Sequence, residues 1–371
     1  MTVGSGSSPV RLGIVGAGFV ADFFLQALQH VRDHEVTVLA ARNAERGGAL
    51  AERYGIPAVV GGAAELAARD DVDIVVVAVP QDSHLEVVSI AAAAGKAVIC
   101  TKPLGRNGAE AAACLAAVTA AGVWHGYAET AVFSPAVTRA KSMVDAGAIG
   151  RVLSVRAREA HGNPHKHARE IDRMGGGPLR GLGCHGVAVG RYFLEGALPV
   201  EAFAWGERLD RDDVESEDNA LMMVRFDDGR VAQVEASWTH VPGLDIRREI
   251  HGNNGWLGAD ETGASELAAF AGTDVGYVME KAGAARGWLR PVLDEPWAYG
   301  YHGQFDHFIA SYRAGIAPRQ TLLDGAIDNA VIDAGYRSMK SGVWEPIELA
   351  ALAGHDLHKR VGALDGVGAA R

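Results

Sequence analysis

The chain has 371 residues, 48% of them hydrophobic and 22% charged, which is enough for two domains with cores of their own. Its formal net charge of −11 disfavours nonspecific binding to nucleic acid or to an anionic membrane, while leaving room for a local basic phosphate pocket. The three cysteines form no CxxC pair, and their odd number argues against a disulfide framework and favours a reducing compartment.

The first residues contain no apolar segment typical of a signal peptide, and no run of about 18 apolar residues suggests a membrane span. We therefore expect a soluble, cytoplasmic protein. Residues 1–9 are rich in glycine and serine and predict a flexible tail.

Short apolar runs alternate with Ala/Leu-rich segments of helical length in the first third of the chain. The predicted strands are 11–16, 36–41, 73–79, 97–100 and 123–128, and the predicted helices are 19–32, 44–54, 82–94 and 108–121. Runs that are apolar throughout are typical of strands buried on both faces. Their alternation with helices predicts a doubly wound parallel sheet, over residues 10–133.

The pattern changes near residue 135. A helical stretch (135–150) precedes segments with alternating polarity, and polar turns separate several of them; these segments are 151–160, 219–226, 231–240 and 244–252. This pattern predicts a second, α+β domain over residues 134–371, with a large, mostly antiparallel open sheet and a helical region at 302–341.

A glycine-rich turn follows the first predicted strand and opens a helix. Its GxGxxA pattern consists of Gly16, Gly18 and Ala21, with Phe19 and Val20 between them. The first glycine allows the turn, the second lets the backbone approach a pyrophosphate, and the small third residue lets the helix lie close to the strand. In this context the motif predicts a Rossmann dinucleotide site. A tight turn without a ligand is the alternative.

The end of the second strand bears on which dinucleotide binds. An acidic residue there would favour NAD, whereas this chain has Ala41-Arg42-Asn43 and then Arg46. Arginine suits a 2′-phosphate because its planar fork makes paired charged hydrogen bonds. We therefore favour NADP, while NAD and a merely solvated Arg42 remain open.

A lysine follows the fourth predicted strand in the sequence Thr101-Lys102-Pro103. Ligands of open α/β sheets bind outside the carboxyl ends of the strands, and Pro103 restricts the turn that carries Lys102. An ammonium group there can donate a hydrogen bond to a substrate hydroxyl or pass on its proton. A solvated lysine is the alternative.

At this point the chain resembles the glucose–fructose oxidoreductase/inositol dehydrogenase (Gfo/Idh/MocA) family over nearly its whole length. The motifs that carry the resemblance are GIVGAGFVA (13–21), VAVPQDSHLEVVSIAAAAGKAVICTKPLG (77–105), YAETAVFSPAV (127–137), GAIGRVLSVRAREAHG (147–162), GGGPLRGLGCHG (175–186), EIHGNNG (249–255) and AGYRSMKSGVWEPI (334–347). The resemblance implies a Rossmann domain, a C-terminal domain whose open sheet forms a homodimer or homotetramer, and NAD(P)-linked chemistry on a sugar or cyclitol carbon.

The resemblance also implies cofactor contacts beyond the glycine turn. They come from Val79, Pro80, His84, Thr101 and Glu129, together with Lys102. Thr101 stands where the family usually has glutamate, and Glu129 occupies the place of a polar residue that contacts the nicotinamide. For His84, a structural role at a helix start is the alternative.

Lys102 and His185 are the predicted catalytic residues. In the family pattern the lysine acts with an Asp-x-x-x-His pair, and His185 matches the histidine, but Gly181 stands in place of the aspartate. A neutral imidazole is well suited to take a hydroxyl proton near neutrality, and a nearby carboxylate would fix its tautomer. We expect a replacement orienting group from residues 159–172, or the substrate itself; otherwise the proton passes through Lys102.

Further substrate contacts are expected around these two residues. The candidates are His161, His165, Asp172, Arg180 and Cys184. Surface-loop positions are the alternative for His161 and His165. These histidines, with His167, Cys184 and His185, also contain ligand types for zinc, but their spacing matches no metal pattern, so we expect no metal.

These features together predict an enzyme that transfers hydride between NAD(P) and a secondary alcohol or ketone carbon of a carbohydrate-like substrate. One alternative is an enzyme that retains NAD(P) and oxidises a sugar transiently, for glycoside cleavage, elimination or epimerisation without net redox change. Another alternative is a non-enzymatic binder that keeps the dinucleotide site.

Overall fold

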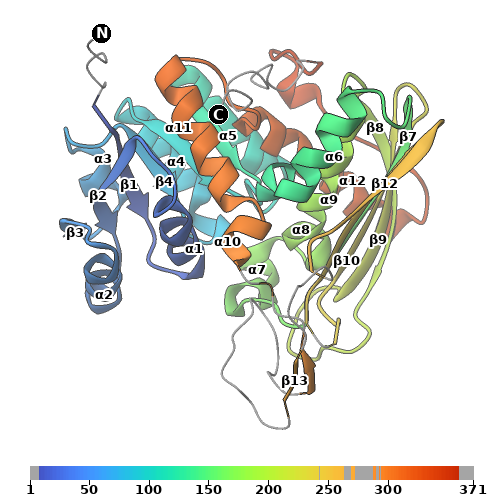
Figure 1. Ribbon diagram of the computed structural model, residues 1–371, viewed down its shortest axis with the longest axis horizontal. Coiled ribbons are helices and arrows are strands. Elements are labelled where there is room, and N and C mark those ends of the chain that lie inside the picture. The colour runs from blue at the N-terminus through green and yellow to red at the C-terminus, as the bar shows by residue number, and fades with distance from the viewer. Residues whose placement is uncertain are drawn as a thin grey trace.

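Two β-sheets flank a layer of helices in the computed structural model (Figure 1). The structure describes residues 8–241, 243–262, 269–271, 287–289, 292 and 294–358. The predicted tail, residues 1–9, lies almost entirely outside this described part of the chain.

The first sheet is parallel and has six strands in the order β3-β2-β1-β4-β5-β6, which confirms the doubly wound prediction. Its strands are β1 (Val10–Val15), β2 (His34–Ala40), β3 (Ala58–Val60), β4 (Ile74–Val77), β5 (Ala97–Thr101) and β6 (His125–Ala128). The helices between them are α1 (Phe19–Leu28), α2 (Ala44–Tyr54), α3 (Ala63–Ala67), α4 (His84–Ala93) and α5 (Gly108–Ala121). Every residue of β4 is buried, as expected for a strand covered on both faces.

The second sheet has seven strands in the order β12-β11-β7-β10-β9-β8-β15. They are β7 (Val152–Ala160), β8 (Pro199–Glu207), β9 (Asn219–Phe226), β10 (Val231–Ser237), β11 (Asp245–Gly252), β12 (Gly255–Asp260) and β15 (Glu345–Pro346). Strands β7 and β10 run parallel and the other neighbours are antiparallel, so the prediction of a mostly antiparallel sheet is confirmed.

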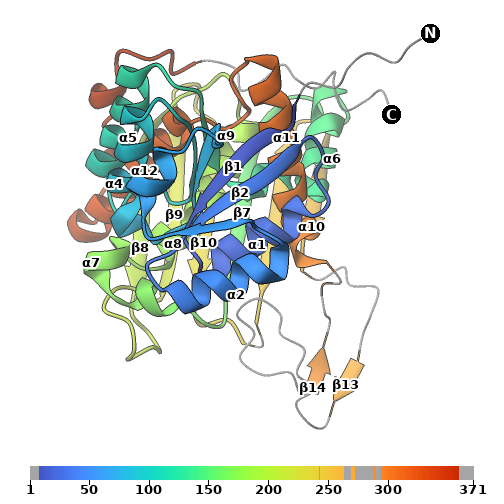
Figure 2. The same cartoon turned by 90° about the vertical axis from the view of Figure 1, so that its left-hand side faces the viewer.

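The remaining elements connect and cover the sheets. The helices are α6 (Pro135–Asp145), α7 (Ile171–Met174), α8 (Pro178–Gly181), α9 (Gly183–Phe193), α10 (Glu295–Ala298), α11 (Tyr301–Ala314) and α12 (Leu322–Ser341), with 3-10 turns η1 (Gln81–Ser83), η2 (Thr130–Phe133), η3 (Lys166–Arg169) and η4 (Ala350–Leu352). Strands β13 (Ala269–Ala271) and β14 (Gly287–Leu289) form a separate pair (Figure 2). No helix of the described chain is long and apolar enough to cross a membrane.

Helix α9 lies flat on the inner face of the second sheet because glycines line its contact with the strands. A Cβ atom at Gly186 would lie 2.8 Å from Val234 of β10, and one at Gly190 would lie 2.7 Å from Ala232. Such distances are too short for a real Cβ contact, so only glycine permits this separation. The glycines around His185 therefore set how deeply that residue sits.

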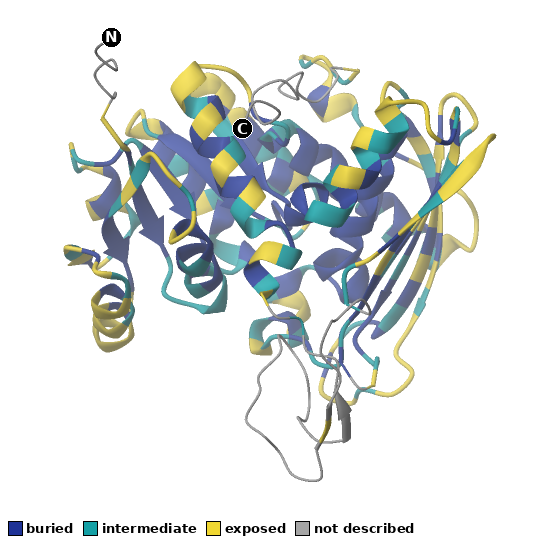
Figure 3. Cartoon of the chain, in the orientation of Figure 1, coloured by how far each residue is buried: buried dark blue, intermediate teal, exposed yellow. Residues whose placement is uncertain are grey.

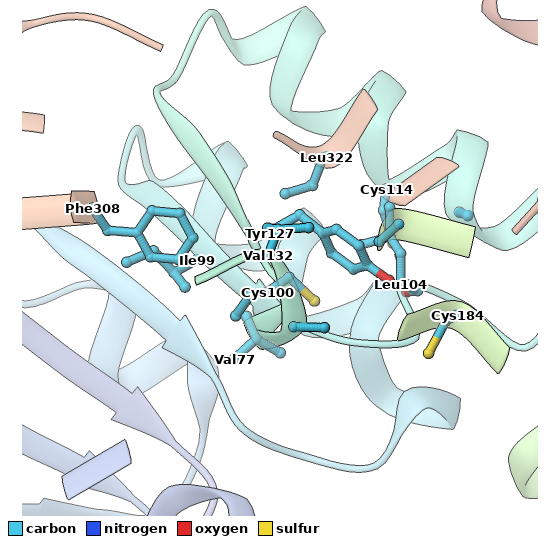
Figure 4. Packing of buried hydrophobic residues seen from close by; sticks show 14 of the residues in the cluster. Val77, Ile99, Cys100, Leu104, Cys114, Tyr127, Val132, Cys184, Phe308 and Leu322 are labelled. Carbon is cyan, nitrogen blue, oxygen red and sulfur yellow. The ribbon is translucent and has the colours of Figure 1, made fainter. Parts of the chain in front are cut away.

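The C-terminal helices join the two halves. Helix α11 packs on α1, while α12 contacts both α5 and β8. Buried residues from both sheets form one continuous cluster, and Figure 4 shows part of it, with Tyr127, Cys100 and Cys184 among its members. The domain boundary after residue 133 remains a prediction, because these late helices cover the N-terminal half as well.

The outer face of the second sheet is exposed (Figure 3). Along β9 the side chains alternate, with Met222 buried and its neighbours Leu221 and Met223 exposed. Phe203 and Trp205 of β8 lie directly across from those two exposed residues. A contiguous exposed apolar face of this kind is typical of an interaction surface.

Candidate active site

The turn after β1 has the geometry that a pyrophosphate requires. Gly16 has a φ of 123°, and a Cβ there would lie 2.2 Å from the carbonyl oxygen of Ala78. Gly18 is the N-cap residue of α1, and a Cβ on it would meet nothing within 4 Å, so the space beside the helix N-terminus is open. Free N–H groups and the helix dipole make such a terminus favourable for anions.

This turn forms one wall of a cleft of about 780 Å³, a volume in the range of cofactor sites. Most of the predicted cofactor residues line it: Gly16, Gly18, Phe19, Val20, Ala41, Arg42, Arg46, Val79, Pro80, Thr101 and Lys102. Ala21 is fully buried behind the turn, as a residue packed between helix and strand. The cleft therefore offers a continuous site for a dinucleotide.

The predicted cofactor contact of His84 needs correction. Its ring is buried behind the cleft, with Nε2 2.9 Å from the carbonyl oxygen of Val79 and Nδ1 3.2 Å from that of Leu104. Burial lowers the pKa of this histidine. His84 thus holds together two segments at the carboxyl edge of the sheet, which matches the structural alternative.

The wall of the cleft beyond β2 is basic. Arg42 and Arg46 are exposed there, and the Asn43 side chain accepts a hydrogen bond from the Arg46 backbone N–H at 2.8 Å, which caps α2. Among the described residues that line the cleft, the carboxylate is Glu86 of α4. No acidic side chain of this lining follows β2, where one would bind a ribose 2′-hydroxyl.

Lys102 follows β5 and reaches across to the second half of the chain. Its Nζ donates a hydrogen bond to the carbonyl oxygen of Gly181 at 3.0 Å, so the position expected to hold an aspartate contributes its backbone instead. A Cβ at Gly181 would lie 2.4 Å from the Met174 side chain, which fills the space in front of it.

His185, the second residue of interest, pairs with Glu129. Its Nδ1 lies 2.5 Å from Oε1 of Glu129, and both side chains are buried. Burial opposes ionisation of Glu129, but the charges of His185 and Lys102 outweigh it and hold the pKa of this carboxyl below its usual value. The carboxylate absent from position 181 is therefore supplied by the segment after β6.

The nicotinamide contact expected for Glu129 stays a prediction. Its side chain does not line the large cleft but faces the imidazole. The orienting group for His185 was expected within residues 159–172 and instead comes mainly from outside that segment. Glu159 does lie 3.8 Å from Nε2 on the other side of the ring.

Glu159 is itself part of a buried ion pair. It accepts a hydrogen bond from the guanidinium of Arg248 on β11. Burial disfavours its charge, but His185, Arg248 and His161 together hold the pKa of Glu159 well below its usual value. An imidazolium at His185 would therefore lie between two ionised carboxylates.

A second, small cavity of about 40 Å³ opens in front of these groups. Three of its lining residues, Lys102, Thr130 and Tyr301, also line the large cleft, so the two cavities adjoin. The others are Ala131, Glu159, His161, His185, Ile246, Arg248, Glu261 and Tyr299. The lysine and the histidine predicted to be catalytic therefore meet at the end of the dinucleotide cleft.

The predicted substrate histidines lie in different places. His161 lines the small cavity, with Nε2 3.4 Å from Oε1 of Glu159. His165 lines the large cleft, and its ring centroid lies 5.1 Å from that of Phe19 in the glycine turn. His161 thus lines the small cavity, whereas His165 lines the large cleft.

Three other predicted substrate residues lie outside both cavities. Arg180 is buried in an ion pair with Asp333 and lies 3.2 Å from Oδ1 of Asn329, because the packing of α8 on α12 directs it away from the cleft. Asp172 is exposed. Cys184 is buried against the Gly181 carbonyl, and burial raises the pKa of its thiol. These placements do not support substrate contacts.

The candidate ligand set for a metal differs from the one considered in the sequence. Ligand atoms of Glu129, Cys184 and His185 lie within 4.8 Å of one another. A thiolate is the form that binds metal, whereas burial keeps this thiol protonated. In addition, Glu129 already pairs with His185. These residues fit an acid–base pair better than a metal centre.

Sequence reasoning missed Arg248, Glu261 and the two tyrosines of the small cavity, Tyr299 and Tyr301. For Arg248 a signal was present: Ile246, Arg248 and Ile250 alternate along β11, so the arginine occupies an inward position. A charged residue in the buried phase of a strand requires a charged partner, here Glu159. No comparable pattern marks Tyr299 or Tyr301.

Comparison with known proteins agrees with this architecture. The profile described as "Oxidoreductase family, NAD-binding Rossmann fold" (GFO_IDH_MocA) matches residues 10–127, and the "GFO/IDH/MocA C-terminal domain" profile matches residues 137–258. Among solved structures, GenD2 from gentamicin A biosynthesis in complex with NAD aligns with a TM-score of 0.85 and 27% identity, over 94% of this chain and 100% of that one.

Curated relatives include several dehydrogenases. Inositol 2-dehydrogenase of Rhizobium meliloti (strain 1021) is 26% identical over 89% of this chain and 97% of its own length. Trans-1,2-dihydrobenzene-1,2-diol dehydrogenase of Bos taurus is 31% identical over 54% of this chain, and the match covers 60% of that enzyme.

A glycine turn at a Rossmann cleft, with a lysine and a carboxylate-paired histidine at its end, defines a nucleotide-dependent oxidoreductase. With both family profiles matched in order, the chain belongs to the Gfo/Idh/MocA oxidoreductase family.

Proposed function

We propose that the enzyme transfers hydride between NADP and a secondary alcohol or ketone carbon of a sugar or cyclitol. One observation carries this proposal: His185, paired with Glu129, lines a small cavity together with Lys102, and Lys102 also lines the dinucleotide cleft. An acid–base pair and a polarising cation thus lie at the end of the cleft where the nicotinamide ring of a bound dinucleotide would be placed.

The residues of the cleft fit a dinucleotide. Because Gly16 and Gly18 have no side chains, a pyrophosphate can approach the backbone in the open space beside the N-terminus of α1. Thr101 lines the cleft at the end of β5. When bound, the nicotinamide supplies the hydride acceptor for oxidation or the hydride donor for reduction.

Lys102 would bind the reacting oxygen. An ammonium group has three N–H donors, and the Gly181 carbonyl accepts one of them, so donors remain for a substrate oxygen. A cation at this place stabilises the negative charge that develops on the oxygen as its proton leaves.

His185 would exchange that proton. Because an ionised carboxylate only accepts hydrogen bonds, Nδ1 carries hydrogen toward Glu129, and Nε2 of the neutral ring keeps the lone pair that takes a hydroxyl proton. The resulting imidazolium lies 3.8 Å from Glu159 Oε1, which stabilises its charge. Reduction of a ketone runs the same proton transfer backwards.

The preference for NADP rests on Arg42 and Arg46, which line the cleft beyond β2 without an acidic neighbour in the described lining. The variant Arg42→Asp introduces the carboxylate that would bind a ribose 2′-hydroxyl and repel a 2′-phosphate. Its kcat/KM ratio of NADP⁺ to NAD⁺ should fall at least about tenfold. An unchanged ratio would contradict the assignment.

The test of the reaction is turnover of polyols, sugars and keto-sugars, followed by absorbance of the reduced nicotinamide. Lys102→Ala and His185→Ala should each lower kcat by about 10²- to 10⁴-fold, while the exposed-residue control Lys340→Ala should leave it unchanged. Full activity of Lys102→Ala would reject its role. Cofactor that survives desalting, with product formed and no net nicotinamide change, would instead select the non-redox alternative.

The exposed face of the second sheet is our proposed homo-oligomer interface. Its apolar residues on β8 and β9 include Phe203, Trp205, Leu221 and Met223. Burial of such a face between two copies would remove a large apolar area from water.

A further inference from the structure

Three buried glutamates surround or adjoin the small cavity. Glu159 and Glu261 line it, and Glu129 lies behind His185 at its edge. The fixed positive charges among the described residues that line it are Lys102 and Arg248. With all three glutamates ionised and the imidazole uncharged, these groups leave an excess of one negative charge around the small cavity.

The excess charge is located at Glu261. Arg248 donates a hydrogen bond to Glu159, and its Nε lies 3.5 Å from Oε1 of Glu261, so two carboxylates share one guanidinium. Glu129 is paired with His185. Within the described part of the chain, Oε1 of Glu261 accepts no hydrogen bond, and its side chain is only 3% exposed.

Oε1 of this carboxylate can therefore accept a hydrogen bond from a ligand. An ionised carboxylate only accepts hydrogen bonds, and burying it without a full partner is costly. A ligand carboxylate or phosphate would add to the excess negative charge. An ammonium group would balance the excess negative charge of the ionised carboxylates.

We propose that the substrate is an amino sugar or aminocyclitol, whose ammonium group binds beside Glu261 while a hydroxyl of the same ring reacts at Lys102 and His185. This inference rests on the proposed function. The adjoining cavities allow it: the small one takes the amine-bearing edge of the ring, and the shared residues Lys102, Thr130 and Tyr301 lead to the dinucleotide cleft.

The protonation of Glu261 is consistent with this arrangement. Burial raises the pKa of Glu261 to about 7; the charges of Glu159 and Glu129 add to the rise, while Arg248 and a hydrogen bond from Ser134 oppose it. An adjacent ammonium group favours the ionised carboxylate and so lowers that pKa. Binding of an amine is therefore coupled to release of a proton from this site near neutral pH.

The experiment compares matched ligands that differ by one group. D-Glucosamine is compared with D-glucose and D-glucuronate, and an aminodeoxyinositol with myo-inositol, both by kcat/KM and by calorimetric binding to the NADPH-saturated protein. In each set, kcat/KM and affinity for the amine should exceed those for the neutral ligand by about tenfold or more, as expected for a hydrogen-bonded charge pair. D-Glucuronate should be the poorest ligand of its set.

The variant Glu261→Gln should abolish the preference for the amine and change kcat/KM for the neutral member much less. Glu249→Gln, which alters an exposed carboxylate of β11 paired with Arg156 at 3.7 Å, is the matched control and should keep the preference. Equal affinity for amine and neutral ligand in the unmodified protein, or a preference that survives Glu261→Gln, would overturn the inference.

Binding and turnover separate this inference from the proposed function. Tight, Glu261-dependent binding of the amine without any turnover would reject the proposed hydride transfer but leave the amine site standing. Turnover of the neutral ligand, with no higher kcat/KM for the amine, would reject the amine site but leave the proposed hydride transfer standing. Failure of every amine to bind would also reject the amine site.

Discussion

At the scale of residues, the central finding is that His185 receives its carboxylate from Glu129, 56 positions earlier in the chain. The family pattern places that acid four residues before the histidine, where this chain has Gly181. The acid is therefore present in space although it is absent from the motif. Its position on the opposite half of the molecule leaves the imidazole free to turn one nitrogen toward the small cavity.

Replacement of Glu129 tests this role. Glu129→Gln keeps the size of the side chain but removes the charge that fixes the tautomer and stabilises the imidazolium. We expect kcat to fall by about 10²- to 10⁴-fold, with a smaller loss for Glu129→Asp. The pH profile of kcat/KM should shift in Glu129→Gln, because the carboxylate acts through His185.

Cofactor affinity serves as the control for that variant. Glu129 does not line the large cleft, so the dissociation constant for NADPH, measured by fluorescence, should stay within about threefold of the original. A large loss of cofactor affinity with an unchanged pH profile would instead support the nicotinamide contact first expected for Glu129.

The sequence predicted the reactive pair but not its surroundings. Lys102 and His185 were found because each stands in a recognisable local motif. The pairing of Glu129 with His185 has no sequence spacing that reveals it, because it depends on how two domains meet. Glu159 was included only as one of several candidates, although it follows Val155 and Ala157 in the buried phase of β7.

At the scale of elements, α9 shows why so many glycines surround the histidine. Gly186 and Gly190 face β10 and bring the helix close to the sheet. The tight packing fixes the depth of His185, so the position of a reactive side chain depends on residues that carry no side chain.

Gly186→Ala should therefore destabilise the protein even though alanine is the better helix former. The added methyl would lie 2.8 Å from Val234 Cγ1, and overpacking of this kind costs about 1–3 kcal/mol, against about 1 kcal/mol gained in helix propensity. Urea unfolding should show the loss. Val234→Ala in the same chain should restore part of it, and strictly additive effects would contradict direct contact.

The elements themselves were largely predictable where the pattern was simple. The strands at 219–226 and 244–252 were expected close to their observed bounds, since their inward residues alternate with polar ones. Strand β8 was missed because small Ala202 and Ala204 point inward while large Phe203 and Trp205 point outward. A half-buried strand is usually recognised by apolar residues on its inward face that alternate with polar residues on its outward face, and β8 does not show that pattern.

At the scale of the whole molecule, the outer sheet face and the buried carboxyl groups decide how the protein assembles and how its stability depends on pH. The outer face carries exposed apolar side chains on β8 and β9, whereas several acidic groups are enclosed inside. Both features run against the usual arrangement of charge outside and apolar groups inside.

The exposed apolar residues on β8 and β9 predict self-association. Trp205→Glu combined with Leu221→Glu would bury two charges in the proposed interface, since these residues are direct neighbours across β8 and β9. Sedimentation velocity should show a shift from dimer or tetramer to monomer, with cofactor binding retained. A monomeric unmodified protein would contradict the proposed interface.

The buried carboxyl group of Glu217 predicts a pH dependence of stability. It accepts hydrogen bonds from the Tyr336 hydroxyl at 2.8 Å and the Gly177 N–H at 3.2 Å, but burial dominates and raises its pKa to about 7. The folded state therefore holds this proton more tightly than the unfolded state does. The free energy of unfolding should fall as pH rises from about 4.5 to 7.

Glu217→Gln should reduce that fall, because glutamine has no proton to lose and its Oε1 can still accept both hydrogen bonds. The free energy of unfolding that the unmodified protein loses through Glu217 over this pH range is about 3 kcal/mol at most, at 1.36 kcal/mol per pKa unit. Thermal unfolding over the pH range tests it, with Glu249→Gln as the exposed control. Equal slopes in all three proteins would reject the assignment.

The contact between Glu129 and His185 also limits how this scaffold can be recombined. One partner belongs to the nucleotide-binding half and the other to the half with the open sheet. A chimera that takes its first half from a relative without a carboxylate at this place would lack the partner of the His185 imidazole. The two residues must be inherited together, as a linked pair that crosses the boundary between modules.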